Sequence, residues 1–462
     1  MARETTDRSR RGLIAALAGL PALALAAPSH ARELFSLADL RGTASDNEAG
    51  LIPGASDDQS RLLQAALDAA AQDDRALRIP PGVFHVSNIV LPARVRLVGT
   101  PGASRLVYSG GGHFLISENG SHVEMSGLTI DGANRGLGDY AKAALRITNC
   151  EHAVIENCRI VGSTANGLQV ERSGGRIERT TVSGARGDCG IYALENRGFS
   201  IIGNDVTACS NGGILVHRWQ PGEDGTIVSG NRIFNIGAQL GGTGQWGNGI
   251  NVFRADSVMI ANNQIADCAF SAIRSNSGGN VQISGNNCLR SGETAIYSEF
   301  EFTGAVISGN VVDGAAIGIS LANFMQGGRM AVCANNLVRN LHASAPYSEG
   351  GQFFGIGISA EADTTITGNV IENAEGFGIN LGWGPYLRDV VASSNVIRKA
   401  DTGMAVSVVE GAGNTVISDN VISGFRTGAI VGHRWKEAVT GDLALAGARK
   451  FEHLAIERNR IG

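Results

Sequence analysis

The sequence predicts an all-β protein, a parallel β-helix of about a dozen coils with one α-helix covering its N-terminal end. A short phrase ending in asparagine recurs along the chain, as ISGN at Asn286 and Asn310, VSGN at Asn231 and ITGN at Asn369. Some repeats follow at 23 or 24 residues, too few for a pair of helices, and the repeats are rich in Val, Ile and Gly. Variants of the phrase end at Asn157, Asn204, Asn263, Asn336, Asn395, Asn420 and Asn459.

A second phrase places one strand of each coil. Runs of glycine, isoleucine, a small or polar residue and an apolar residue occur at 249–252, 318–321, 357–360 and 378–381. Because side chains alternate between the two faces of a strand, the isoleucine and the next residue but one point inward. The residues between them therefore point outward, and we expect three short strands in each coil.

The recurrent asparagines are interpreted as structural. Each follows a strand and is often preceded by glycine, where the chain must turn sharply. Asparagine tolerates left-handed backbone angles and can hydrogen-bond the backbone or an asparagine one coil away. We therefore expect a ladder of asparagines along one corner of the coils.

The N-terminus has the pattern of a secretory signal. Arg10 and Arg11 precede an apolar run to Ala27, and Ser29-His30-Ala31 fits a cleavage site between small residues. The paired arginines resemble the signal of the bacterial twin-arginine pathway. We expect a signal peptide at 1–31, a β-helix domain at 32–462, no membrane span in the mature protein, and a location in the periplasm or outside the cell.

Composition restricts the partners of this protein. The formal net charge is −5, and the Lys and Arg residues number 38 against 43 Asp and Glu, which argues against nucleic acid as a ligand. No Cys/His metal spacing or phosphate-binding glycine loop occurs, so no metal or other cofactor is expected. The seven cysteines lack a CxxC pair and are interpreted as mostly buried thiols, with Cys150 and Cys158 as the one pair to examine for a disulfide.

The N-terminal block carries a resemblance. Asp57 and Asp58 precede an amphipathic run, predicting a capping helix over 57–75, and Ile79-Pro80-Pro81-Gly82-Val83-Phe84 follows. With the repeats, this block resembles the pectate-lyase-like superfamily of single-stranded right-handed parallel β-helix proteins. The twin-arginine signal adds a similarity to exported bacterial repeat proteins of uncharacterised activity. The catalytic motifs of polygalacturonases and alginate epimerases are absent, so the resemblance implies the fold and leaves the chemistry open.

Insertions around the Gly-Ile strand are predicted to wall a groove along its outer face. Loops at 241–246 and 347–353 precede the strand, and loops with His217-Arg218-Trp219, Trp383-Gly384-Pro385-Tyr386 and His433-Arg434-Trp435 follow it. The two His-Arg-Trp runs lie at equivalent coil positions. All four tryptophans fall in these walls, where aromatic rings can stack on sugar rings or pack over loop backbone. The candidates for binding a polysaccharide are Trp219, Trp246, Trp383, Trp435, Asn251, Asn276, Glu361, Asn380 and Arg434.

A catalytic patch is expected on the same outer face. Neighbouring coils lie about 4.8 Å apart, so Arg274, Tyr297 and Glu299 should be contiguous. Cleavage or epimerisation of a uronic-acid polymer needs a cation for the substrate carboxylate and groups that move protons. Arg274 suits the first role, Tyr297 the second, and Glu299 and His217 supporting roles.

The sequence is compatible with three functions. The leading hypothesis is an exported polysaccharide lyase or epimerase, a monomer or weak homo-oligomer. The first alternative is a non-catalytic glycan-binding or structural protein of the cell envelope. The second is an inverting glycoside hydrolase, because Glu299 and Glu361, two coils apart, would be separated by about 9.6 Å, near the upper limit for inversion.

Overall fold

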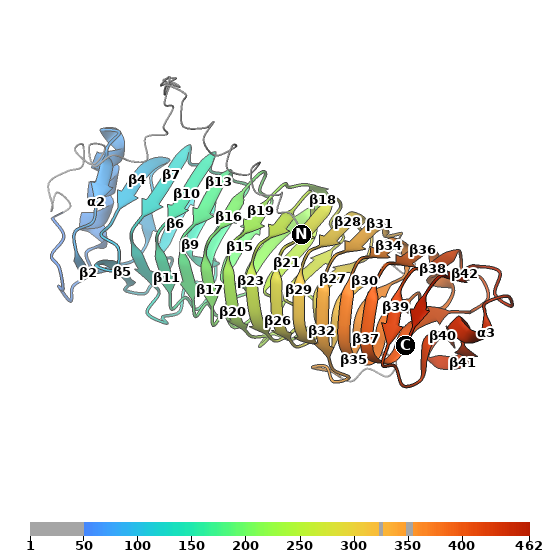
Figure 1. Cartoon of the computed structure of the whole chain (residues 1–462). Coiled ribbons are helices and arrows are strands. Elements are labelled where there is room, and N and C mark those ends of the chain that lie inside the picture. The colour runs from blue at the N-terminus through green and yellow to red at the C-terminus, as the bar shows by residue number, and fades with distance from the viewer. Residues whose placement is uncertain (1–49, 323–326, 348–353) are drawn as a thin grey trace, which may run out of the picture. The chain divides into compact units, whose positions relative to one another are not determined.

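Short parallel strands wind through successive coils and stack in chain order, from blue to red in Figure 1. The computed structural model describes residues 50–322, 327–347 and 354–462, and these belong to the unit Thr43–Gly462. The predicted signal peptide, 1–31, lies outside the described residues. The strands form three stacks, and hydrogen bonds join each strand to the strand of the same stack one coil later.

Stack 1 is a 15-stranded sheet. Its strands are β1 (Ala76–Arg78), β4 (Arg94–Val98), β7 (His122–Ser126), β10 (His152–Glu156), β13 (Gly175–Glu178), β16 (Ser200–Ile202), β19 (Ile227–Ser229), β22 (Met259–Ala261), β25 (Val281–Ser284), β28 (Thr303–Ser308), β31 (Arg329–Ala334), β34 (Ala362–Thr367), β36 (Arg388–Ser393), β38 (Thr415–Ser418) and β42 (Leu454–Glu457).

Stack 2 follows the turn after each strand of stack 1. Its strands are β2 (Gly82–Val86), β5 (Ser104–Tyr108), β8 (Thr129–Asp131), β11 (Arg159–Val161), β14 (Thr181–Ser183), β17 (Asp205–Thr207), β20 (Arg232–Ile236), β23 (Gln264–Cys268), β26 (Asn287–Ser291), β29 (Val311–Ala315), β32 (Leu337–Leu341), the first parts of β35 (Val370–Leu381) and β37 (Val396–Ser407), β39 (Val421–Ser423) and β43 (Arg460–Ile461).

Stack 3 carries the Gly-Ile phrase. Its strands are β3 (Ile89–Val90), β6 (Leu115–Glu118), β9 (Ala143–Thr148), β12 (Asn166–Glu171), β15 (Ile191–Leu194), β18 (Ile214–Glu223), β21 (Ile250–Asp256), β24 (Ile273–Asn276), β27 (Thr294–Glu299), β30 (Ile317–Ala322), β33 (Ile356–Ala360), the last parts of β35 and β37, and β40 (Gly428–Arg434). Because β35 and β37 run through both stacks, stacks 2 and 3 count as one 28-stranded sheet.

The core lies inside the coils and consists of aligned rows of aliphatic side chains. In stack 1, Ile260, Ile283, Ile307 and Cys333 are in register from coil to coil, and all are buried. The prediction that Cys333 takes an inward isoleucine position is therefore confirmed. All seven cysteines are free and buried, so Cys150 and Cys158 do not form a disulfide. The predicted all-β parallel β-helix is the fold observed.

The expected asparagine ladder is present and runs through the corner between stacks 1 and 2. Oδ1 of each member after Asn204 accepts hydrogen bonds from the backbone N–H and Nδ2 of the member one coil earlier, as Asn310 does from Asn286 at 2.9 and 3.0 Å. Its Nδ2 donates to a carbonyl of the preceding coil, which for Asn310 is that of Ile283, at 3.0 Å. The members are Asn204, Asn231, Asn263, Asn286, Asn310, Asn336, Asn369, Asn395, Asn420 and Asn459.

Two details of the expected ladder are wrong. The left-handed residue is not the ladder asparagine but the residue before it, such as Gly309 with φ 65° or Asn262 with φ 57°. Asn157, with φ 52°, is such a preceding residue, and Cys158 takes the corner position next to it. The glycines of the phrase thus provide the turn, and the asparagines provide the hydrogen bonds between coils.

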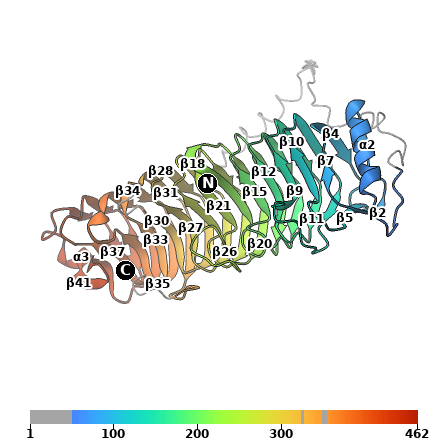
Figure 2. The same cartoon turned by 180° about the vertical axis from the view of Figure 1, so that it is seen from behind.

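The N-terminal end is covered by α2 (Ser60–Gln72), within the predicted 57–75. Its buried residues Leu63, Leu67 and Ala70 face the first coil, and α2 contacts β1 to β4. Both views place it beside these first strands (Figures 1 and 2). The last coil carries an antiparallel strand, β41 (Glu437–Asp442), and α3 (Leu443–Ala446), which the sequence did not predict. In the described part of the chain, no helix has the length and apolar character needed to span a membrane.

Candidate functional site

The outer face of stack 3 has the register that the alternation of its residues predicts. Asn251, Arg274, Tyr297, Ser320 and Ser359 are paired from coil to coil in β21, β24, β27, β30 and β33. Two residues later, a second outward row contains His217, Phe253, Asn276 and Glu299. His217 and His433 both occupy this second row, which confirms that the two His-Arg-Trp runs are equivalent.

Arg274, Tyr297 and Glu299 lie together as expected, but Arg274 and Glu299 form an ion pair with each other. Arg274 donates from Nε and Nη2 to the two carboxylate oxygens of Glu299, at 2.7 and 3.0 Å. Both side chains are buried, and the Arg274 guanidinium lies over the Tyr297 ring at 5.1 Å. Burial by itself would lower the pKa of Arg274, but Glu299 raises that pKa above its usual value. Arg274 is therefore buried with its charge balanced by Glu299, which makes it a poor partner for a substrate carboxylate.

His217 is the centre of a different arrangement, three strands of stack 3 wide. Its Nε2 lies 2.7 Å from Oδ1 of Asn251, and its Nδ1 lies 3.3 Å from the hydroxyl of Tyr192. Since Asn251 offers an acceptor, the neutral imidazole carries its proton on Nε2, and Nδ1 accepts the proton of Tyr192. Phe253 packs against the imidazole with its ring 5.7 Å away. Tyr192, His217 and Asn251 thus form a hydrogen-bonded chain across β15, β18 and β21.

Two members of the hydrogen-bonded chain, Tyr192 and His217, line a cavity of about 660 Å³. One wall is formed by 136–142, a second by Asp188 and the loop that holds Leu240 and Gln245, and a third by Trp219. The floor is formed by the outward residues Gln169, Tyr192, His217 and Phe253. Lys142, which is exposed, supplies positive charge among these described lining residues.

The four tryptophans separate into two pairs. Trp219 lines the cavity and is 60 % exposed, and Trp246 donates from Nε1 to Asp188 of the same cavity at 3.1 Å. This contact spans 58 residues and fixes the 237–249 loop over the earlier coils. Trp383 and Trp435 lie in the last coils, edge to face, with ring centroids 5.4 Å apart. Only the first pair is placed beside the Tyr192–His217–Asn251 chain.

The other predicted residues are spread along stack 3. Asn276 donates to Glu299 at 2.9 Å, and Asn380 donates to the hydroxyl of Ser359 at 3.1 Å. Arg434 is exposed and pairs with Glu410. Glu361 is buried beyond Tyr297, whose pKa rises through burial and the charge of Glu299. None of these four residues lines the cavity at His217.

Sequence reasoning missed Tyr192, Gln169 and Asp188. A signal for the first two was present, since Gly190-Ile191-Tyr192-Ala193 and Gly167-Leu168-Gln169-Val170 carry the same phrase as 249–252. Extending the outward row to these earlier coils would have placed Tyr192 next to His217. Asp188 lies before the strand, outside the phrase, and no pattern in the sequence marks it.

His217 gives the folded protein a pH dependence. Burial lowers its pKa from 6.5 to about 4, so its stabilising contribution is complete above pH 6.5 and is lost as the pH falls through about 4. We expect urea unfolding to show a loss of stability between pH 7.5 and 4.5 that is smaller in His217→Gln. An identical loss in both proteins would contradict the value assigned to His217.

Metal ligation is a separate question. Among residues 50–322, 327–347 and 354–462, no group of three or more His, Cys, Asp or Glu side chains is arranged to hold a metal ion.

Comparisons with known proteins concern the fold. Residues 112–244 match the family described as right handed beta helix region, and no curated protein matches the chain. Among solved structures, the N-terminal fragment of gene product 12 of bacteriophage Phi29 has 15% identity and a TM-score of 0.49, covering 82% of this chain and 67% of that one. The A-module of the mannuronan C-5 epimerase AlgE4 of Azotobacter vinelandii has 15% identity and a TM-score of 0.44, covering 88% and 98%.

A third solved structure is PfbA, a surface adhesin of Streptococcus pneumoniae, with 15% identity, a TM-score of 0.40, and 87% and 95% of the two chains covered. Identities this low do not extend to a shared activity. The kinship with twin-arginine-exported repeat proteins stays a prediction. Over residues 112–244, the family match and the coils described here agree on a right-handed parallel β-helix.

Proposed function

We propose that this protein is exported and acts on a polysaccharide, as a lyase or epimerase, in the cavity on the outer face of β12, β15, β18 and β21. The observation that carries the proposal is the chain of hydrogen bonds from Tyr192 through His217 to Asn251, of which Tyr192 and His217 line that cavity. A tyrosine hydroxyl in contact with a neutral imidazole can both give and take a proton, as either reaction needs.

The chemistry assigns a role to each member of the chain. Tyr192 passes its proton to Nδ1 of His217 while it removes the proton at C5 of a uronic acid. In a lyase, the C4–O bond then breaks, and the leaving oxygen takes a proton from Tyr192, which recovers its own from His217. In an epimerase, a water molecule gives a proton to C5 from the opposite face, and the resulting hydroxide takes a proton from Tyr192, which recovers its own from His217. Asn251 holds the imidazole in the tautomer whose Nδ1 is free to accept.

Substrate binding rests on the cavity walls. Trp219 offers an exposed ring for stacking on a sugar, and Lys142 offers a positive charge for the carboxylate of the reacting unit. Arg274, the expected cation, is engaged by Glu299, so Lys142 takes that role in the proposal. Tyr297 is a second tyrosine of the same outward row.

The test is incubation of residues 32–462 with a panel of bacterial and plant polysaccharides, with the products read by mass spectrometry and proton NMR. A lyase is expected to release fragments with an unsaturated end, and an epimerase to change the sugar without a change in chain length. Deuterium from the solvent should appear at C5 in the epimerised product.

The other outcomes select the alternatives. Saturated fragments would favour an inverting hydrolase, although Glu299 is a poor candidate acid because Arg274 and Asn276 occupy its oxygens. Polymers that bind and remain intact would overturn catalysis and favour a glycan-binding protein of the cell envelope. In that case Trp219→Ala should weaken binding, since an exposed ring loses its stacking surface.

A further inference from the structure

A second cavity lies on the same coils, beyond the ends of the stack 3 strands. Its volume is about 470 Å³. Apart from Cys150, which is buried, and glycine, its lining consists of polar and charged residues, with three arginines among them. The lining residues are Asn149, Cys150, Glu151, Arg172, Ser173, Gly174, Glu195, Arg197 and Arg218.

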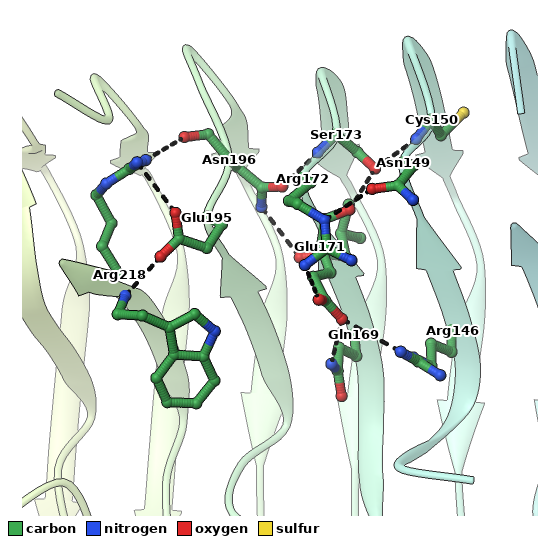
Figure 3. A network of polar contacts seen from close by, with 12 residues as sticks. Arg146, Asn149, Cys150, Gln169, Glu171, Arg172, Ser173, Glu195, Asn196 and Arg218 are labelled. Carbon is green, nitrogen blue, oxygen red and sulfur yellow. Dashed lines mark hydrogen bonds and ion pairs between the residues drawn. The ribbon is translucent and has the colours of Figure 1, made fainter. Parts of the chain in front are cut away.

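Two of the arginines are held in place by the coils themselves (Figure 3). Nε of Arg172 donates to Asn149 at 2.7 Å, and Arg172 also pairs with Glu171. Arg218 pairs with Glu195 at 3.0 Å and donates to the carbonyl of Asn196 at 3.2 Å. Each guanidinium has five N–H donors, so both keep donors beyond these contacts. The Nε of Arg218 is buried and has no hydrogen-bond partner in the described part of the chain.

Arg197 is the third arginine and differs from the other two. Its side chain is exposed, and no described residue forms an ion pair or hydrogen bond with it. Arg290 of stack 2 is different, since it binds both oxygens of Asp267 at 2.7 and 2.8 Å. The guanidinium of Arg197 has no carboxylate partner within the described ranges and lies near the guanidinium groups of Arg172 and Arg218, which their contacts hold in place. Such a group is suited to bind an anion with several oxygens.

The two cavities share a wall. Trp219 lines the first, its neighbour Arg218 lines the second, and the backbone N–H of Trp219 donates to Glu195 at 2.5 Å. Glu171 likewise contacts Gln169 of the first cavity at 3.4 Å and Arg172 of the second. A sugar chain bound at Trp219 is thereby placed next to the three arginines.

We propose that the second cavity is a subsite for an anionic substituent, a carboxylate or sulfate, on the glycan held in the first. Arg197 makes the direct contact, and Arg172 and Arg218 complete the positive surface. The inference rests on the proposed function for its glycan and adds the substrate class, a polymer charged beyond the reacting unit. Glu151 and Glu195 also line the second cavity. Their negative charges oppose the binding of anions that do not reach Arg197.

The experiment uses three polymers with one backbone: dextran, carboxymethyl-dextran and dextran sulfate. Binding to the mature protein is measured by calorimetry at low and high salt. We expect the charged polymers to bind more tightly than dextran, and Arg197→Gln to weaken their binding about tenfold without an effect on dextran. A larger effect on one charged polymer identifies whether carboxylate or sulfate is preferred. High salt should reduce the difference.

Arg290→Gln, which removes an exposed arginine outside both cavities, is the matched control and should bind like the wild type. Equal binding of the three polymers by the wild type, or equal loss for Arg197→Gln and Arg290→Gln, would overturn the subsite. Inorganic sulfate, titrated into wild type and Arg197→Gln by NMR, tests the anion site without any glycan. If sulfate distinguishes the two proteins while no polysaccharide is altered, the subsite stands and the proposed catalysis fails.

Discussion

Tyr192→Phe is expected to lower kcat on the polysaccharide identified in the panel by about 10²- to 10⁴-fold, the usual contribution of general acid–base catalysis. The substitution removes only the hydroxyl that lies 3.3 Å from Nδ1 of His217. The ring remains to pack against the imidazole at 5.3 Å. Because binding rests on Trp219 and Lys142, KM should change much less than kcat. Initial rates at saturating and limiting substrate separate the two parameters.

Tyr297→Phe is the matched control, since Tyr297 lies in the same outward row, is largely buried and, like Tyr192, has a pKa that burial raises. It lies under the guanidinium of Arg274 and does not line the cavity at His217. We expect it to keep wild-type kcat. A loss of activity in Tyr297→Phe with full activity in Tyr192→Phe would move the acid–base role to Tyr297 and overturn the assignment of the cavity.

The largest effect on stability is expected for Asn310→Ala, in the middle of the asparagine ladder. The change removes the acceptor of the buried Asn286 N–H and the Nδ2 donor to the Ile283 carbonyl. Each buried group left without a partner costs about 1–3 kcal/mol, so the free energy of unfolding should fall by about 2–6 kcal/mol. Urea unfolding followed by circular dichroism measures the loss. Because each coil contacts only its neighbours, the unfolding transition should also broaden.

Asn414→Ala is the control for the ladder. Asn414 is exposed, and its side chain makes one hydrogen bond, to Asp389 at 3.2 Å. This substitution should change the free energy of unfolding by less than about 0.5 kcal/mol. If Asn310→Ala costs no more than Asn414→Ala, the ladder does not hold the coils together, and the stability lies in the aliphatic rows alone.

The repeats were sufficient to predict the fold because they encode local geometry. Alternation within four residues sets which side chains face the core, and the interval between asparagines sets the length of a coil. The contiguity of Arg274, Tyr297 and Glu299 followed from these two facts. The bidentate contact between Arg274 and Glu299 did not follow, because register places two side chains side by side without determining which of them bond.

The candidate site was predicted in part. His217, Asn251, Trp219 and Trp246 were singled out from the sequence, but as separate members of a long groove. In the folded protein His217 and Trp219 line one cavity, and Asn251 and Trp246 bind its lining residues His217 and Asp188. This happens because the 237–249 loop reaches back to Asp188 and because Tyr192 lies one coil before His217. The direction of a loop depends on how it packs against other coils, and the repeated sequence pattern contains no information about that packing.

The sequence by itself determined the parallel β-helix, the capping helix, the ladder and the outward rows, since each depends on residues close together in the chain or on one repeated interval. Only the tertiary structure decided which outward residues remain available to contact a ligand. Arg274 and Glu299 are buried and form an ion pair with each other. Tyr192, Trp219 and Arg197 instead line cavities. The physical reason is that charge pairing and exposure depend on side chains from different coils meeting in space, and those meetings depend on loop length and packing rather than on local pattern.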